Sequence, residues 1–192
     1  MLKKLFLLVI ISITIFGCAG VPNQMSYVTP TFNKQDNNAK IVFYRPTNFV
    51  GSAVPTTIVE VLNSEKIAYV GELYSGNGII YSVKPGKHVF GVSGESWKSV
   101  TIYAYKSKFY YIHISPTPGF WYANFKPMPI SKENMKYLDN IDQIKWTSPN
   151  DNATKLLDQK ALSYMKAWEN AIKADRIIGI PADFGLGNHI QK

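Results

Sequence analysis

The sequence predicts a mainly β protein: an antiparallel β-sandwich of about seven to eight strands with a C-terminal amphipathic helix, preceded by a cleaved signal peptide. Three observations predict this class. Between residues 40 and 115, short runs of β-branched and aromatic residues alternate with Gly, Pro and Asn breaks, which is typical of strands joined by tight turns. These breaks are too short for βαβ crossovers, so we expect hairpins. An apolar period of 3.6 residues appears only after residue 150 and predicts the helix.

Residues 1–17 have the composition of a secretory signal peptide. Lys3 and Lys4 precede an apolar run over residues 5–16. This run fits the hydrophobic region of a signal peptide, whereas a helix that spans a bilayer needs about 20 residues. An uncleaved anchor helix and a buried core helix are the alternatives, but a core helix would need a polar face that this run lacks.

Cys18 is the only cysteine, so it cannot form an intramolecular disulfide. Together, Ile15, Phe16, Gly17 and Cys18 resemble the lipobox of bacterial lipoproteins, although Phe16 departs from the small or β-branched residue usual at its place. The resemblance implies that Cys18 is lipidated and becomes the new N-terminus. The inner-membrane retention signal of enteric bacteria is an Asp at the next position, where this chain has Ala19. The resemblance therefore implies an exported protein, held by lipid in the outer membrane of a Gram-negative bacterium.

The charge distribution gives no sign of a nucleic-acid partner. The whole chain has a formal net charge of +8, and loss of Lys3 and Lys4 with the signal peptide lowers it to +6. The lysines are spread along the chain without a block of five or six, so we expect a solvated surface. Beside an anionic bilayer, each well-placed Lys or Arg adds about 1 kcal/mol of attraction. Residues 18–192 are enough for one core without disulfides, metal or cofactors.

Residues 18–39 are rich in Pro, Asn, Gln, Ser and Thr and have no apolar period, so we predict a flexible tether. The β-sandwich domain follows over residues 40–126. A final edge strand is expected within residues 120–125, ended by Pro127. The other strands are predicted at residues 40–46, 56–62, 66–73, 78–83, 87–93, 99–105 and 108–115.

Residues 127–192 are predicted as a connecting segment followed by the C-terminal helix. Asn150 and Asn152 offer N-caps, and Gly179 and Pro181 are expected to end the helix. We interpret its apolar face as the cover of the β domain, and a partner-binding face is the alternative. The apolar stripe contains Leu157, Ala161, Tyr164, Met165, Trp168, Ala171 and Ile172.

The β region resembles a family of uncharacterised bacterial lipoprotein domains, in which a Tyr-Arg-Pro strand is followed by a Gly-led strand and a Pro-Gly-x-His hairpin. The similarity spans residues 40–125. It implies the fold and the anchoring, but no activity, because the family carries none. The matching positions are Tyr44, Arg45, Pro46, Gly71, Pro85, Gly86 and His88.

Catalytic and metal-binding motifs are absent from the sequence. The stretch "GVSGE" lacks the last glycine of a nucleophile elbow, and no H-E-x-x-H, cysteine pair or P-loop pattern occurs. Of the histidines, His88 and His113 lie on predicted strands, so a metal site formed in space stays open, although a structural role is the ordinary one. We therefore predict no catalytic residues, no metal and no cofactor.

Aromatic residues provide the other candidate site. Phe120, Trp121, Tyr122 and Phe125 cluster beside prolines, and exposed rings of this kind stack on glycans or anchor protein partners. The alternative is that they fill the core. We predict a non-enzymatic binding or envelope-assembly module whose partner is an unknown envelope protein or glycan. An envelope hydrolase with a spatially assembled site and a surface-exposed lipoprotein contacting host molecules are the competing functions.

Overall fold

The computed structural model describes residues 23–31, 37–48, 51–63, 65–121, 123–173 and 177–180. The predicted signal peptide (residues 1–17), Cys18, Tyr122 and His189 lie outside the described residues. The elements in chain order are β1 (Met25–Tyr27), β2 (Ala39–Arg45), β3 (Thr56–Val61), β4 (Ile67–Leu73), β5 (Asn77–Val83), β6 (Gly86–Val92), β7 (Lys98–Ala104), β8 (Phe109–Pro118), β9 (Ala123–Pro129), the 3₁₀ helices η1 (Lys132–Leu138) and η2 (Ile141–Gln143), β10 (Lys145–Pro149), α2 (Asn152–Lys173) and β11 (Ile177–Ile180).

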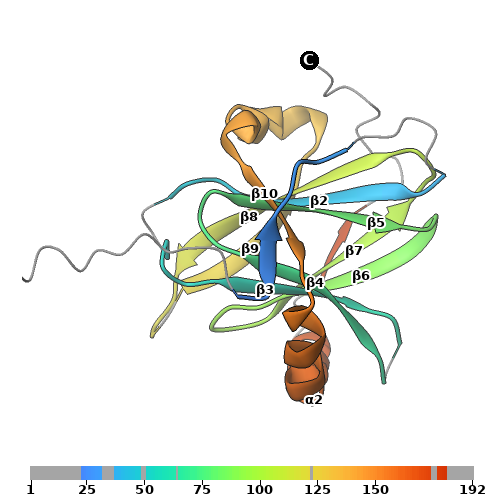
Figure 1. Cartoon of the computed structure of the whole chain (residues 1–192), viewed down its shortest axis with the longest axis vertical. Coiled ribbons are helices and arrows are strands. Elements are labelled where there is room, and N and C mark those ends of the chain that lie inside the picture. The colour runs from blue at the N-terminus through green and yellow to red at the C-terminus, as the bar shows by residue number, and fades with distance from the viewer. Residues whose placement is uncertain are drawn as a thin grey trace, which may run out of the picture.

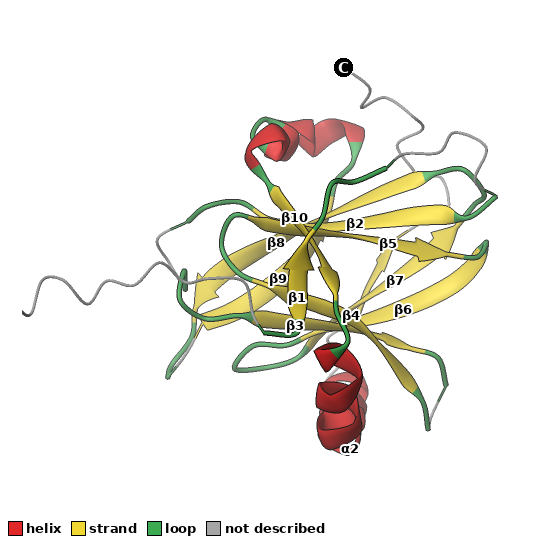
Figure 2. Ribbon diagram, in the orientation of Figure 1, coloured by secondary structure: helices red, strands yellow, loops and turns green. Residues whose placement is uncertain are grey.

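The described strands form two sheets that pack face to face, with helices on the outside (Figures 1 and 2). The six-stranded sheet has the order β1-β10-β5-β2-β8-β9, and the five-stranded sheet has the order β11-β7-β6-β3-β4. In Figure 2 the 3₁₀ helices lie above the six-stranded sheet and α2 lies below the five-stranded one. The prediction of a mainly β fold with two layers and a C-terminal helix is confirmed.

The expectation of a wholly antiparallel sandwich is wrong, because the six-stranded sheet is mixed. β2 runs antiparallel to β5 but parallel to β8, with Lys40 opposite Phe109. β10 is parallel to β5, and β11 is parallel to β7. β2 has a strand on each side and is covered on both faces, so its sequence "AKIVFYR" is almost entirely buried. A continuous apolar run is typical of such a central strand.

Two of the tight turns connect the sheets instead of closing hairpins. Pro85 and Gly86 follow β5 of the six-stranded sheet and open β6 of the five-stranded sheet. Gly86 has φ +144°, a conformation that favours glycine. The turn over residues 105–108 carries the chain back from β7 to β8 in the same way. Residues 62–66, by contrast, close the predicted β3–β4 hairpin.

The core lies between the sheets and is built from alternate residues of the strands. In β7, Val100, Ile102 and Ala104 point inward and are buried, whereas Tyr103 is exposed. This confirms the alternation predicted for the strand. The ring of Phe43 in β2 meets that of Phe90 in β6 edge to face, with centroids 5.1 Å apart, so aromatic contacts join the two sheets.

Each outer face has its own apolar cluster. On the six-stranded sheet, Val42, Tyr44 and Tyr111 pack beneath Leu138 of η1. On the five-stranded sheet, α2 provides the cover. Leu157, Ala161, Tyr164 and Met165 pack against Val59, Ile67 and Trp97. Four members of the predicted stripe therefore contact the β domain. The other three, Trp168, Ala171 and Ile172, have side chains outside the described part of the chain.

The tether prediction is wrong for Met25–Tyr27, because these residues form β1 against β10. Met25 is buried in the core. The division at residue 127 is also wrong, because β10 adds a strand to the six-stranded sheet. Gly179, expected to end the helix, lies in β11, since α2 already ends at Lys173.

Four prolines lie within the β8–β9 hairpin, although Pro127 was expected to end a strand. Ile112 faces Pro129, Ile114 faces Pro127 and Pro116 faces Phe125 across the hairpin. Tyr111 and Ile130, which follow the Ile112–Pro129 pair, are hydrogen-bonded, because the Ile130 amide donates to the Tyr111 carbonyl at 2.9 Å. Hydrogen-bonded and non-hydrogen-bonded pairs alternate along an antiparallel hairpin. All four prolines therefore occupy pairs that exchange no backbone hydrogen bonds, where a missing N–H costs nothing. β9 is the predicted edge strand, shifted toward the C-terminus.

Gly71 marks a β-bulge in β4. Ile58 faces Gly71 but Val59 faces Tyr69, so one residue of β4 is left without a partner. Gly71 has φ +150°. A Cβ there would lie 2.5 Å from Ile79 Cδ1 and 2.8 Å from Met25 Cε. Glycine is therefore required both by the backbone and by the close packing of β1 and β5.

Candidate functional site

The tip of the β8–β9 hairpin carries two exposed aromatic rings. Phe120 is 83% exposed and Trp121 is 79% exposed. Their rings meet edge to face with centroids 5.0 Å apart. They are the most exposed aromatic side chains among the described residues, and no described residue covers them.

The backbone beneath these rings is held by the β6–β7 connection. The Glu95 carboxylate accepts hydrogen bonds from the amides of Phe120, at 2.7 Å, and Trp121, at 3.3 Å. The Glu95 amide donates to the Ala123 carbonyl at 3.2 Å. Asn124 accepts from both the amide and the hydroxyl of Ser96, each at 3.0 Å. The β6–β7 connection therefore holds the backbone on both sides of the tip, while the rings of Phe120 and Trp121 stay free to contact a partner.

Phe125 does not belong to this exposed surface, which corrects its assignment as a binding residue. Its side chain is fully buried. Residues alternate along β9, so Phe125 points inward together with Ala123. The Arg45 guanidinium lies over its ring, 4.6 Å from the centroid. Of the predicted aromatic cluster, Phe120 and Trp121 are therefore the described residues that are exposed, and Tyr122 is not described.

Arg45 is a buried cation that binds backbone carbonyls. Its Nη1 donates to Val54 at 2.7 Å and to Leu73 at 3.4 Å, and its Nη2 donates to Gly51 at 2.5 Å. Nε has no partner within the described residues. Burial lowers the pKa of Arg45 to about 10, so the side chain stays charged at neutral pH. It joins the loop after β2 to the end of β4, which is a structural role.

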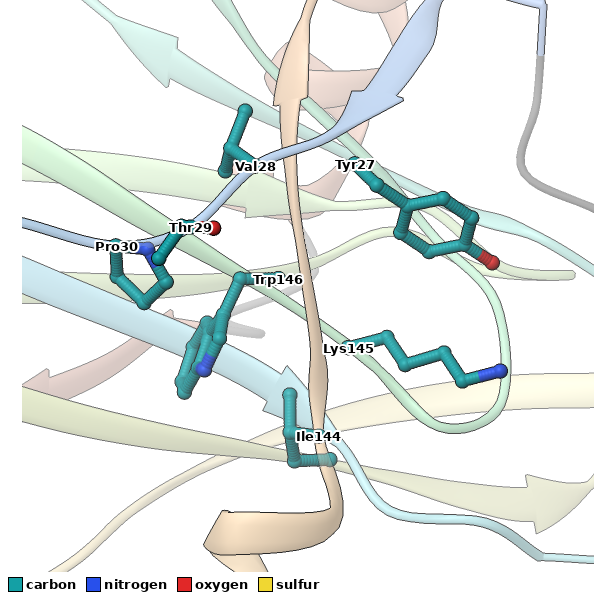
Figure 3. A pocket seen from close by; sticks show the side chains of 7 residues that line it. All are labelled: Tyr27, Val28, Thr29, Pro30, Ile144, Lys145 and Trp146. Carbon is teal, nitrogen blue, oxygen red and sulfur yellow. The ribbon is translucent and has the colours of Figure 1, made fainter.

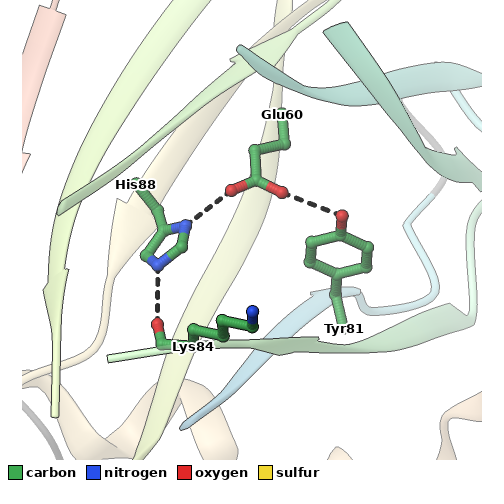
Figure 4. Close-up of polar contacts among 4 residues, drawn as sticks. All are labelled: Glu60, Tyr81, Lys84 and His88. Carbon is green, nitrogen blue, oxygen red and sulfur yellow. Dashed lines mark hydrogen bonds and ion pairs between the residues drawn. The ribbon is translucent and has the colours of Figure 1, made fainter. Parts of the chain in front are cut away.

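A polar network crosses the interior at one end of the sandwich (Figure 4). Tyr81 of β5 donates to Glu60 Oε2 at 2.8 Å, and His88 Nδ1 lies 2.5 Å from Glu60 Oε1. His88 Nε2 lies 2.7 Å from the Lys84 carbonyl. Both ring nitrogens of His88 therefore lie within hydrogen-bond distance of an oxygen acceptor. Burial, followed by the hydrogen bond to Glu60, raises the pKa of Tyr81, so its hydroxyl remains a donor.

This network resembles part of a catalytic triad but lacks its nucleophile. A triad histidine keeps one nitrogen for the carboxylate and turns the other to a hydroxyl. Here the second nitrogen of His88 is taken by the Lys84 carbonyl (Figure 4). Glu60, Tyr81 and His88 therefore tie β3 to β5 and β6, and the network joins the two sheets.

His113 lies on the other face of the six-stranded sheet, so the two strand histidines do not meet. It is buried between the rings of Tyr44 and Tyr137, with centroid distances of 5.5 Å and 5.1 Å. Burial lowers its pKa, and Nδ1 has no hydrogen-bond partner among the described residues. No group of three His, Cys, Asp or Glu residues that could hold a metal is found in the described part of the chain.

Two of the surface hollows lined by described residues lie beside β1 and beside β4, and neither gathers polar groups around a common centre. The larger, about 510 Å³, lies beside β1 and β10 (Figure 3). In Figure 3, Trp146 and Lys145 project to opposite sides of β10, and Tyr27 lies on the side of Lys145. The smaller hollow, about 360 Å³, lies between β4 and the first turns of α2 and is lined by Ile67, Ala153 and Leu157, among others.

Comparison with protein-family models, with curated proteins and with solved structures gives no match. The resemblance to a family of lipoprotein domains therefore stays a prediction. Within the residues that the structure describes, no helix has the length and apolar character needed to cross a bilayer.

Sequence reasoning found the exposed rings but missed the residues that hold them. Glu95 and Asn124 contact the tip from a loop and a strand that local patterns do not connect. Glu60 and Tyr81 were also missed, because their contact joins the two sheets and local patterns do not show which strands face each other. The polar Glu60 in the apolar run "TTIVEVL" was the one usable signal, since a carboxylate inside a buried strand needs a partner.

Proposed function

We propose that the protein is an exported lipoprotein, anchored in the outer membrane through Cys18, which binds an envelope protein or glycan without catalysing a reaction. The anchor rests on the order of Lys3 and Lys4, the apolar run and Cys18 in the sequence. Two or more acyl chains give stable attachment, whereas one alone binds only marginally.

Recognition runs through the Phe120–Trp121 pair. The observation that carries this proposal is the combination of two rings that are 83% and 79% exposed with a backbone held by Glu95. Aromatic side chains dominate binding hot spots because each one buries a large area on contact. A backbone that is already ordered loses little entropy on binding. Exposed aromatic rings suit both a sugar ring and an apolar pocket of a protein.

The experiment compares photo-crosslinking and pull-down from intact cells for three forms: the native chain, the double variant F120A/W121A and the control Tyr105→Ala. Tyr105 is also an exposed aromatic, 54% exposed, but lies on the turn between β7 and β8. We expect the double variant to lose a partner that the native chain and the control both retain. Sedimentation with isolated cell-wall glycan tests the glycan arm.

A partner captured equally by the native chain and the double variant would reject the tip as the recognition site. Cys18→Ser tests the anchor separately, because it removes the sulfur that would accept the lipid. We expect this variant to lose acylation and detergent partitioning. Mass spectrometry that finds an unmodified Cys18 in the native protein would reject the anchor.

A further inference from the structure

We infer that the α2 end of the fold lies against the bilayer, so that the outward face of α2 contacts lipid headgroups and the η1 face points away from the membrane. This inference rests on the proposed lipidation of Cys18. It adds the orientation of the domain, which lipidation alone does not determine.

The chain leaves the described fold beside the start of α2. Asn23 is held there because its carbonyl accepts from Asn150 Nδ2, at 3.0 Å, and from Asn152 Nδ2, at 3.3 Å. The Asn150 amide also donates to the Gln24 carbonyl at 2.9 Å. β1 then joins β10 in an antiparallel pair. Asn23, where the chain leaves the described fold, is therefore held to the start of α2 by side-chain hydrogen bonds. It is held to the six-stranded sheet by the pairing of β1 with β10.

The distance from this exit point to the anchor is short whatever path the chain takes. Cys18 precedes Asn23 by five residues, which span at most about 18 Å at full extension. η1 and α2 cover the outer faces of different sheets. Stacked sheets lie about 10 Å apart and a helix adds about 10 Å on each side, which gives roughly 30 Å between the two helical layers. A bilayer reached from Asn23 therefore lies nearer to α2 than to η1.

The surface of α2 that faces away from the sheet suits an anionic bilayer. Lys155, Leu162 and Lys166 share one face at the spacing i, i+7 and i+11. Leu162 is 84% exposed. Three lysines (155, 160 and 166) and one glutamate (169) are the exposed charged side chains described on α2. Since the apolar face of α2 packs on the five-stranded sheet, its outward face rests on headgroups and does not insert.

In Figure 1, α2 and the β3–β4 turn lie together at the lower end of the molecule, and the 3₁₀ helices lie at the opposite end. The β3–β4 turn adds the exposed Leu62 and Lys66. Among the described residues, the end of the fold nearest the anchor thus presents two exposed leucines and four exposed lysines, beside the exposed Glu65, Asp151 and Glu169. Lysine ammonium groups bind phosphate and carboxylate headgroups, and their stems cover apolar surface.

The test uses the lipidated full chain in vesicles that contain anionic phospholipid and a lipid-borne fluorescence quencher. Because lipid blocks the thiol of Cys18, a single cysteine introduced at Leu162→Cys or Met135→Cys takes an environment-sensitive fluorophore at one place. Met135 lies on η1 and is 45% exposed, so it is the matched control. Lys155→Cys provides a second position on the outward face of α2.

We expect the label at positions 162 and 155 to lose fluorescence to the quencher and the label at 135 to keep it. Equal quenching at 162 and 135, or quenching at 135 alone, would overturn the orientation while the anchor stands. If the native chain itself takes up the thiol label and does not float with the vesicles, the lipidation fails and the orientation fails with it. Circular dichroism confirms that each variant is folded.

Discussion

His88→Leu should destabilise the fold by removing one of the two side-chain hydrogen-bond partners of the buried Glu60 carboxylate. Glu60 Oε1 lies 2.5 Å from His88 Nδ1, and the two side chains are 8% and 16% exposed. Leaving a buried polar group without one of its hydrogen-bond partners costs about 1–3 kcal/mol, and more for a charged group. We expect about 3 kcal/mol, the upper end of this range, because both side chains are mostly buried, although Tyr81 still donates to the carboxylate.

The rescue variant H88L/E60Q separates the stranded charge from lost packing. Glutamine keeps an acceptor for Tyr81 but carries no charge, so we expect it to restore more than half of the loss. A change of 3 kcal/mol corresponds to a fall of roughly 6–12 °C in Tm for a chain of this size. Urea unfolding followed by tryptophan fluorescence measures the free energies. A loss below about 0.5 kcal/mol for His88→Leu, or a double variant no more stable than the single one, would refute this reasoning.

Three further predictions concern stability. Gly71→Ala should cost more than Gly86→Ala in urea unfolding, because both positions have positive φ but only Gly71 has neighbours where a Cβ would lie; equal losses would mean that packing plays no part. Burial lowers the pKa of His113, so below about pH 6.5 the unfolded chain binds a proton that the folded chain resists. The free energy of unfolding should therefore fall by up to about 1.4 kcal/mol per unit as the pH decreases. His113→Phe should flatten this pH dependence in urea unfolding, and an unchanged slope would contradict the prediction. Met165→Ala should cost about 2–5 kcal/mol, whereas Leu162→Ala, on the exposed face of the same helix, should stay within about 0.5 kcal/mol; similar losses would show that α2 does not cover the sheet as described.

Local structure could be predicted from the sequence because it depends on neighbouring residues. The alternation in β7 and the stripe Leu157, Ala161 and Tyr164 in α2 were both readable, since burial follows the period of the element. The assignment of each strand to one of the two sheets could not be predicted from the sequence. Pro85 and Gly86 indicate a tight turn, but a turn residue does not reveal whether the chain closes a hairpin or changes sheet.

The long-range pairs were hidden for a related reason. β10 has only the short run "KWTSP", and its place beside β5 depends on contacts across more than 60 residues of sequence. The candidate site, too, could be predicted only in part. Aromatic clustering drew attention to residues 120–125, but only the fold separates the exposed Trp121 from the buried Phe125.

The parallel pairing of β2 with β8 has a consequence for the order in which the chain folds. Lys40 and Phe109 face each other, although most of the β domain lies between them in sequence. Such distant pairing gives a high contact order and therefore slow folding, in the range of milliseconds to seconds. Until β8 is available, β2 pairs only with β5 and its other edge stays open, which is a state prone to aggregation. The central pairing of the six-stranded sheet therefore cannot form until the chain has been synthesised as far as β8.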